Sequence, residues 1–211
     1  DSKNSAEFLI NKFVKPGKNV LTLKIYRWST GSYLECQDFW RISGIERDVF
    51  LYSQPKAALK DFRVTSTLDD TYKDGIFKLG ADLRNNGSAA SNMALVYELL
   101  DAKGNVVATG EKTADVAAGE TRTVSFDQTL PGVKTWTSEA PNLYKLVMTV
   151  KENGKVNEII PFNVGFRRIE IKPTEQLARN GKPYVCLFIN GQPLKLKGVN
   201  IHEPCYRSLY D

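Results

Sequence analysis

Apolar and polar residues alternate with a period of two along most of this chain, and helical periodicity is nearly absent. Between residues 57 and 163 such segments recur at short spacing, separated by turn signals that include Asn85-Asn86-Gly87 and Asn153-Gly154. The pattern predicts seven strands, over residues 62–66, 76–84, 93–100, 106–109, 121–127, 144–151 and 156–162. Seven strands within about 100 residues are typical of an immunoglobulin-like β-sandwich, so the predicted fold class is all-β.

The segments on both sides of this sandwich carry the same alternation. Before it, a strand or extended segment is predicted over residues 8–14, and strands are predicted over residues 21–25 and 48–52. Pro55 then interrupts strand pairing and marks a domain boundary. After the sandwich, a hairpin and a further strand are predicted over residues 168–172, 184–189 and 194–199. The predicted domains are residues 1–56, 57–163 and 164–211.

The last predicted strand has no later segment with which it could pair. A strand with an open edge is neither stable nor soluble for long. We therefore expect the chain to be an internal slice of a longer protein. Open edges could also pair two copies, so a homo-oligomer is possible.

Composition limits the classes of protein to which the chain can belong. Of its 211 residues, 42% are hydrophobic and 25% are charged, and no apolar stretch approaches the ~20 residues of a membrane span. The formal net charge of +5 comes from basic residues that alternate with acidic and apolar ones. This pattern indicates a solvated basic surface rather than a nucleic-acid interface. The sequence does not indicate the cellular compartment of the protein.

Cysteine and histidine are too few for most metal or nucleophile sites. The three cysteines, Cys36, Cys186 and Cys205, have neither metal-ligand spacing nor the even number of a disulfide set. We expect them to be free thiols. His202 is the only histidine in the sequence, so a cluster of several histidines is excluded.

The three tryptophans, Trp28, Trp40 and Trp136, allow two interpretations. Aromatic rings can stack on sugars, but each tryptophan lies within or beside a strand or junction, where burial is commoner. We expect them in the core. If Trp136 closes the bottom of the sandwich core, Trp136→Ala should cost about 3 to 5 kcal/mol.

Three motifs, in order along the chain, carry a family resemblance. Residues 31–49, which include the run QDFWRISG, closely resemble the segment that closes the sugar-binding-like sandwich of β-galactosidases in glycoside hydrolase family 2. Residues 136–144, WTSEAPNLY, resemble a signature late in that family's immunoglobulin-like domain. Residues 164–167, VGFR, followed by LKGVNIHE at 196–203, resemble the entry into its catalytic barrel.

The resemblance implies an immunoglobulin-like β-sandwich flanked by a partial jelly-roll sandwich and by the first strands of a truncated (β/α)8 barrel. It also implies a parent enzyme that hydrolyses terminal β-galactosides with retention, using two glutamates on later barrel strands. This chain would then be an inactive scaffold. Na+ and Mg2+ are expected in the parent enzyme, and neither is required by the fragment.

Asp38, Asn200 and His202 are the substrate-binding residues that the resemblance implies. His202 matches a histidine that binds sugar hydroxyls, which suits an imidazole with one donor and one acceptor nitrogen. A loop-capping histidine is the alternative. Asp38 matches an aspartate that helps to bind sodium near the galactose 6-hydroxyl, since hard cations prefer oxygen ligands. A carboxylate paired with Arg41 or Arg47 is its alternative.

Glu203 receives at most a supporting role. A retaining glycosidase needs two carboxyls ~5 Å apart, and a single glutamate near the end of the chain has no partner. Two departures from the family pattern leave fine substrate contacts open: Cys36 stands where an acidic residue is expected, and Pro204-Cys205 follows where a further histidine is common. The segment 173–188 is also longer than the usual hairpin, so its local geometry is unassigned.

Two other functions stay open on the sequence. One is a non-catalytic immunoglobulin-like module that binds carbohydrate or acts as a spacer, although the tail at residues 198–203 favours an enzyme. The other is a family-2 β-glucuronidase or β-mannosidase, although the QDFWRISG run looks more like galactosidases. The expected partner is a β-galactoside sugar, with no nucleic acid and no membrane.

Overall fold

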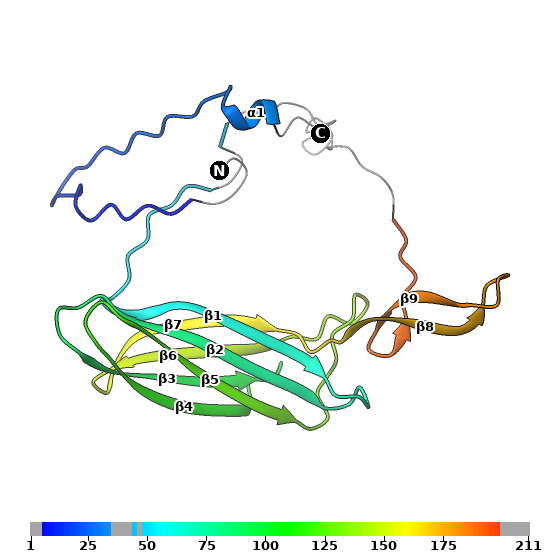
Figure 1. Cartoon of the computed structure of the whole chain (residues 1–211). Coiled ribbons are helices and arrows are strands. Elements are labelled where there is room, and N and C mark those ends of the chain that lie inside the picture. The colour runs from blue at the N-terminus through cyan, green and yellow to red at the C-terminus, as the bar shows by residue number, and fades with distance from the viewer. Residues whose placement is uncertain (1–5, 35–43, 46–47, 199–211) are drawn as a thin grey trace. The chain divides into compact units, whose positions relative to one another are not determined.

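The seven strands predicted between residues 57 and 163 are all present in the computed structural model, which describes residues 6–34, 44–45 and 48–198. The first sheet has the order β1-β2-β5 and contains β1 (Ala57–Leu68), β2 (Gly75–Asn85) and β5 (Thr121–Leu130). The second has the order β4-β3-β6-β7 and contains β3 (Ser91–Leu100), β4 (Val106–Val116), β6 (Tyr144–Glu152) and β7 (Lys155–Val164). All neighbouring strands are antiparallel, and the two sheets form a sandwich (Figure 1). The predicted all-β, immunoglobulin-like fold is confirmed.

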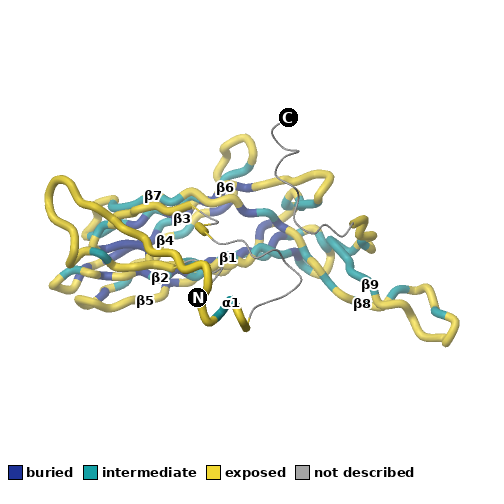
Figure 2. Tube along the Cα trace, turned by 90° about the horizontal axis from the view of Figure 1, so that it is seen from above, coloured by how far each residue is buried: buried dark blue, intermediate teal, exposed yellow. Residues whose placement is uncertain are grey.

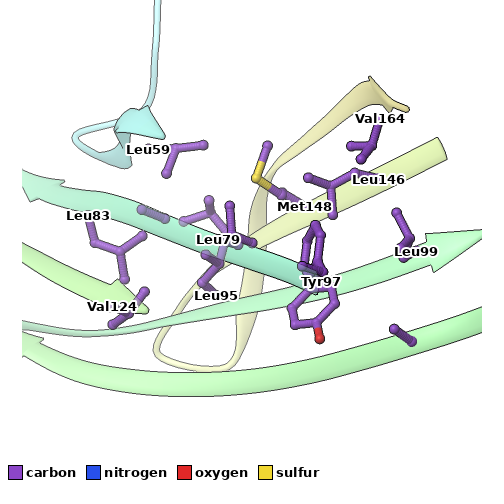
Figure 3. Close-up of a cluster of buried hydrophobic side chains, with 14 of the residues drawn as sticks. Leu59, Leu79, Leu83, Leu95, Tyr97, Leu99, Val124, Leu146, Met148 and Val164 are labelled. Carbon is purple, nitrogen blue, oxygen red and sulfur yellow. The ribbon is translucent and has the colours of Figure 1, made fainter. Parts of the chain in front are cut away.

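The alternation in the sequence decides which side chains enter the core. In β2, Phe77, Leu79, Ala81 and Leu83 are buried, because every second residue of a strand points to the same face. Strands β3 and β6 repeat this pattern from the opposite sheet. Figure 3 shows side chains of both sheets meeting between the layers, and in Figure 2 the buried positions run along the sandwich strands.

Turn residues with positive φ connect the strands where the sequence predicted turns. Between β6 and β7, Asn153 and Gly154 have φ values of 48° and 80°. Two consecutive positive φ values match the tight hairpin turn whose twist suits antiparallel strands, and Asn-Gly is its preferred sequence. The turn therefore pairs Glu152 with Lys155 and Lys151 with Val156, and a bulge then shifts the register so that Val150 pairs with Glu158.

Tyr97 on β3 is the largest fully buried side chain in the part of the chain that the structure describes. Its ring lies 5.3 Å from that of Phe77 and 4.9 Å from that of Phe126, and its hydroxyl donates to Oε1 of Gln128 at 2.6 Å. Burial raises the pKa of the phenol above its ordinary value. The hydroxyl thus has a partner although the ring lies in the core.

Strands β1 and β7 lie side by side and run in the same direction, so the first strand begins and the last strand ends at opposite ends of the sandwich. The amide of Leu59 donates to Oε2 of Glu158 at 2.8 Å near one end, and Oγ of Ser66 donates to the carbonyl of Gly165 at 2.9 Å near the other. The chain consequently enters the sandwich at Ala57 and leaves it at the opposite end (Figure 1). A strand of this length spans about 35 Å.

A hairpin follows the sandwich, as predicted. Strands β8 (Ile169–Leu177) and β9 (Pro183–Ile189) pair antiparallel, and β10 (Gln192–Pro193) adds two residues to β9. The segment 173–188, whose geometry the sequence left unassigned, forms the outer part of this hairpin, including its turn. The strand predicted over residues 194–199 is not formed at 194–198, and residue 199 lies outside the described residues. Cys186 on β9 is a free thiol, as expected, whereas Cys36 and Cys205 lie outside the described residues.

The chain divides into two units, one made of Ser53–Lys197 and the other of Asp1–Tyr52 with Gly198–Asp211. The described residues of the second unit contain α1 (Thr30–Leu34) and no strand, so the strands predicted over residues 21–25 and 48–52 are wrong. Residues 8–14, predicted as a strand or extended segment, form no strand and turn at residues 11–13. The described part of residues 1–56 accordingly shows no partial jelly-roll sandwich. A strand needs a partner for its backbone groups, and no described segment pairs with these residues. Leu21, Leu23 and Ile25 are consequently exposed.

No helix among the described residues is long and apolar enough to cross a membrane.

Candidate functional site

The site residues that the sequence predicted lie in two segments near the ends of the chain. Asp38 belongs to the first, and Asn200, His202 and Glu203 belong to the second. All of them lie outside the described residues. Their roles stay predictions.

A surface hollow, the exit hollow, lies at the exit end of the sandwich, where the chain leaves it. It has a volume of about 590 Å³ and lies between β1, β7 and the loop that carries Trp136. Leu143, Phe162 and Ile169 line it and are each about half exposed. The guanidiniums of Arg63 and Arg167 also line it.

Trp136 lies beside the core and is only half-buried, so the prediction that it closes the core is wrong. Its indole contacts the backbone at Gly165, where an added Cβ would lie 3.1 Å from Cδ1. Arg167 covers its ring, with Cζ 4.6 Å from the centroid. Phe166, which is fully buried, closes this end of the core instead. Trp28 is 51% exposed and so is not a core residue either, while Trp40 lies outside the described residues.

The chemistry of this hollow is that of a binding or packing surface. Its lining contains two arginines and no carboxylate. Glycoside hydrolysis needs a pair of carboxyls across the scissile bond, and the hollow provides none. Exposed aromatic and arginine side chains are instead typical of contact surfaces.

A second hollow of about 480 Å³ lies on the outer face of the first sheet. Gly80 lines it and pairs with Arg63 on β1 and with Ser125 on β5. An ion pair between Lys78 and Asp127, 2.9 Å apart, borders it. Both partners are more than half exposed, so water screens this pair and the face has the character of ordinary solvated sheet surface.

The loop between β1 and β2, at the exit end of the sandwich, is held by hydrogen bonds to Asp69. The carboxylate of Asp69 accepts from the hydroxyl of Thr71 at 2.6 Å and from the amides of Lys73 and Asp74, each at 3.0 Å. These hydrogen bonds, that from Thr71 above all, hold the pKa of Asp69 at about 2. The loop therefore has a fixed shape, which presents Tyr72 to the hairpin that follows the sandwich.

No three His, Cys, Asp or Glu side chains gather as a possible metal site within the described ranges 6–34, 44–45 and 48–198. Asp38, the predicted sodium ligand, lies outside these ranges. A sodium or magnesium site therefore stays a prediction.

Sequence reasoning missed the residues that join the hairpin to the sandwich: Asp70, Tyr72, Arg168, Glu170, Lys172 and Gly191. One signal was available. Arg168, Glu170 and Lys172 stand two residues apart, so they share one face of a strand and alternate in charge. Their partners lie about 100 residues earlier, and nothing in a local pattern points to them.

Family models match almost the whole of the sandwich and the segment before it. Residues 57–167 match the model of the glycosyl hydrolases family 2, and residues 1–55 match the model of the family 2 sugar binding domain. The second match covers the segment in which the described residues form no strand. The likeness there is one of sequence.

Curated relatives align along nearly the entire chain. A β-galactosidase of Priestia megaterium is 38% identical over 205 residues, which are 96% of this chain and 19% of that protein. A β-galactosidase of Klebsiella pneumoniae is 34% identical over 210 residues, which are 98% of this chain and 19% of that protein. The chain thus spans about a fifth of the length of the curated relatives that it matches.

Solved structures share the fold. A β-glucuronidase of Bacteroides uniformis superposes with a TM-score of 0.67 at 21% identity, over 78% of this chain and 19% of that one. An exo-chitosanase of Amycolatopsis orientalis gives a TM-score of 0.58 at 22% identity, over 72% of this chain and 17% of that one. At such identities the likeness describes the fold alone. With the family model covering residues 57–167, the chain belongs to glycosyl hydrolases family 2.

Proposed function

We propose that this chain is part of a retaining glycoside hydrolase that cleaves terminal β-galactosides. Within that enzyme it is a scaffold and has no turnover of its own. The observation that carries the proposal is the 38% identity, over 96% of the chain, to a protein named β-galactosidase. The exit hollow supports the scaffold role, because its lining has no carboxylate with which to catalyse hydrolysis.

The proposed domains are residues 1–56, 57–163 and 164–211, with the sandwich between two parts that each contribute to one sugar pocket. Asp38 would come from the first part, and Asn200 and His202 from the last. His202 would exchange hydrogen bonds with sugar hydroxyls, and Glu203 would support the pocket. The attacking and proton-donating glutamates would come from the remainder of the enzyme.

The length of the connections is compatible with such a shared pocket. The sandwich separates the entering and leaving chain by about 35 Å. The polypeptide from Asp38 to Ala57 can reach roughly 60 Å when extended. The length of the chain is therefore no obstacle to the proposed pocket.

Asp38 is also the proposed oxygen ligand of a sodium ion in the parent enzyme. A cation held there would supply charge next to a sugar hydroxyl. No step of the proposed reaction is assigned to sodium or magnesium. The carboxylate of Asp38 could also bind a sugar hydroxyl directly.

The decisive experiment compares the isolated chain with the longer protein that contains it. The longer protein should hydrolyse an aryl β-galactoside in preference to the aryl β-glucuronide and β-mannoside, and the isolated chain should hydrolyse none of them. In the longer protein, His202→Ala should lower kcat/KM about ten- to a hundredfold, because a buried hydrogen bond to the sugar is lost. Lys151→Met, on the outer face of β6, is the control and should leave kcat/KM unchanged.

Each contrary result points to a specific alternative. Turnover by the isolated chain that disappears in His202→Ala would refute the scaffold role. Preference for the glucuronide or mannoside would identify another family-2 activity. No turnover of any of the three by the longer protein would favour a carbohydrate-binding or spacer module.

A further inference from the structure

The hairpin of β8 and β9 pairs with neither sheet of the sandwich. It forms a separate sheet with β10, and much of its apolar surface is open, with Ile171 at 75% and Val185 at 66% exposure. A two-stranded hairpin is marginally stable on its own. Its position must therefore depend on side-chain contacts with the end of the sandwich.

Tyr72, in the loop between β1 and β2, makes the central contact. Its hydroxyl donates to Oε2 of Glu170 at 2.7 Å and accepts from Nζ of Lys172 at 2.7 Å, while Lys172 and Glu170 are 3.3 Å apart. The hydroxyl bridge lowers the pKa of Glu170 and raises that of Lys172. Both shifts favour the charged forms, so the three groups form one charge-assisted network.

The ring of Tyr72 is enclosed as well as its hydroxyl. Cζ of Arg168 lies 5.6 Å from the ring centroid, and Nζ of Lys172 lies 5.3 Å from it, within the range of cation–π attraction. The turn at Gly191 packs so closely that an added Cβ would lie 2.7 Å from Cε2 of Tyr72. Tyr72 itself has a φ of 59°, an uncommon value for a bulky residue, which the loop around Asp69 holds in place.

Two further links join the same elements. Nη1 of Arg168 lies 2.6 Å from Oδ1 of Asp70, and this hydrogen bond raises the pKa of Arg168 above its ordinary value. The side chain of Asn190 accepts from the amide of Arg168 at 2.9 Å and donates to the carbonyl of Trp136 at 3.0 Å. The residue before β8 and the residue after β9 are thus both held at the exit end of the sandwich.

We propose that Tyr72 is a positioning residue, and that the junction cluster of Asp70, Tyr72, Arg168, Glu170, Lys172 and Gly191 fixes the direction in which the chain leaves the sandwich. The chain continues from this hairpin toward Asn200, His202 and Glu203. The cluster therefore constrains the direction of the chain that leads to these residues. This last step rests on the proposed function, whereas the clamping of the hairpin does not.

Amide hydrogen exchange of the 211-residue chain tests the clamp directly. Tyr72→Ala should raise exchange in β8 and β9 about tenfold or more, and should leave β2, β3 and β6 unchanged. Tyr72→Phe keeps the ring on Gly191 and removes only the bridging hydroxyl, so a smaller increase confined to the hairpin is expected. Lys172→Met should resemble Tyr72→Phe, because it keeps the stem and removes the ammonium.

Lys151→Met is the matched control, since Lys151 pairs with Glu111 at 3.4 Å and has a side-chain exposure of 30%, close to the 36% of Lys172. It should leave the hairpin unchanged. Unaltered hairpin exchange in Tyr72→Ala would overturn the proposal, as would an equal rise in the sandwich strands. If Tyr72→Ala does not fold, Tyr72→Phe and Lys172→Met decide by the same criterion.

Steady-state kinetics of the longer enzyme test the positioning role. Tyr72→Phe should raise KM for the aryl β-galactoside severalfold, with a smaller effect on kcat and an unchanged melting temperature, because the pocket shifts while the fold persists. An unchanged KM would remove the positioning role. If the unmodified longer protein has no galactosidase activity, the proposed function fails, while the exchange result still decides the clamp.

Discussion

Tyr144 and Phe166 meet edge to face at the exit end of the sandwich, with their ring centroids 5.3 Å apart and their planes at 88°. Phe166 is fully buried, although it lies two residues beyond the end of β7. A parallel bridge between Phe166 and Thr135 holds it there, and the amide of Trp136 donates to its carbonyl at 2.8 Å. The core is thus closed by a residue outside the seven strands.

Phe166→Ala should therefore destabilise the sandwich by about 3 to 5 kcal/mol, the usual cost of a large aromatic side chain lost from a core. Trp136→Ala should cost less, about 1 to 2 kcal/mol, because its indole is only half-buried. Ile159→Ala, at an exposed position of β7, is the control and should stay within about 0.5 kcal/mol. Guanidinium unfolding monitored by near-UV circular dichroism measures all three. A larger loss for Trp136→Ala than for Phe166→Ala would reverse the assignment.

Two strand glycines should respond in opposite ways to an added methyl group. At Gly110 a Cβ would lie 2.7 Å from Cε1 of Tyr97 and 3.0 Å from Cδ1 of Phe126, and both rings are held by the core. Gly110→Ala should cost about 1 to 3 kcal/mol through overpacking. At Gly80 the nearest atom is Oγ of Ser125 at 3.9 Å, so Gly80→Ala should be neutral or slightly stabilising. Thermal unfolding of the two variants gives the comparison, and similar losses in both would contradict it.

The sequence predicted the sandwich well because alternation and burial coincide in its central strands. β4 shows where this signal weakens. Its predicted extent ended at residue 109, whereas the strand continues to Val116. Strand β4 is at the edge of its sheet, and residues 111–113 are polar and exposed, so no apolar alternation marks them.

Other features depend on contacts that a local pattern does not contain. Residues 21–25 alternate as clearly as any strand, yet they form none among the described residues. Alternation places apolar side chains on one face of a strand but does not provide the neighbouring strand with which it must pair. Likewise the sequence cannot tell whether Trp136 or Phe166 enters the core. Tyr72 meets Lys172 across 100 positions of sequence. Asp38 and His202 stay predictions, since both lie outside the described residues.

Asn85 should be the most sensitive polar residue of the core. It is 1% exposed, and its side chain donates to the carbonyls of Ala89 and Val116 at 2.8 and 2.9 Å and accepts from the amide of Gly87 at 2.8 Å. Asn85→Ala leaves the buried carbonyl of Val116 and the less buried groups of Gly87 and Ala89 without this partner, and should cost about 2 to 3 kcal/mol.

Urea unfolding measures this loss. The control is Asn92→Ala, at an exposed position of β3 where the side chain donates to Asp115 at 2.8 Å, and it should change the free energy of unfolding by less than about 0.5 kcal/mol. Equal effects of the two substitutions would mean that water replaces the lost partners of Asn85.

Acid should destabilise the exit end of the sandwich through Asp69. The pKa of this carboxyl is about 2 in the folded chain, below its ordinary value of 3.8, chiefly because Thr71 donates to it. A group whose pKa is lowered by folding contributes stability above its unfolded pKa and loses that contribution as the pH falls through its folded pKa. The contribution of Asp69 is therefore complete at neutral pH and disappears between about pH 4 and pH 2.

Asp69→Asn should melt below the wild type at pH 7, and the two melting temperatures should converge as the pH falls through that window. Asp115→Asn, which removes an exposed carboxylate on β4, is the control for the general loss of a negative charge. A constant difference between Asp69→Asn and wild type from pH 7 to pH 2 would show that the loop is held by the shape of the side chain and not by its charge.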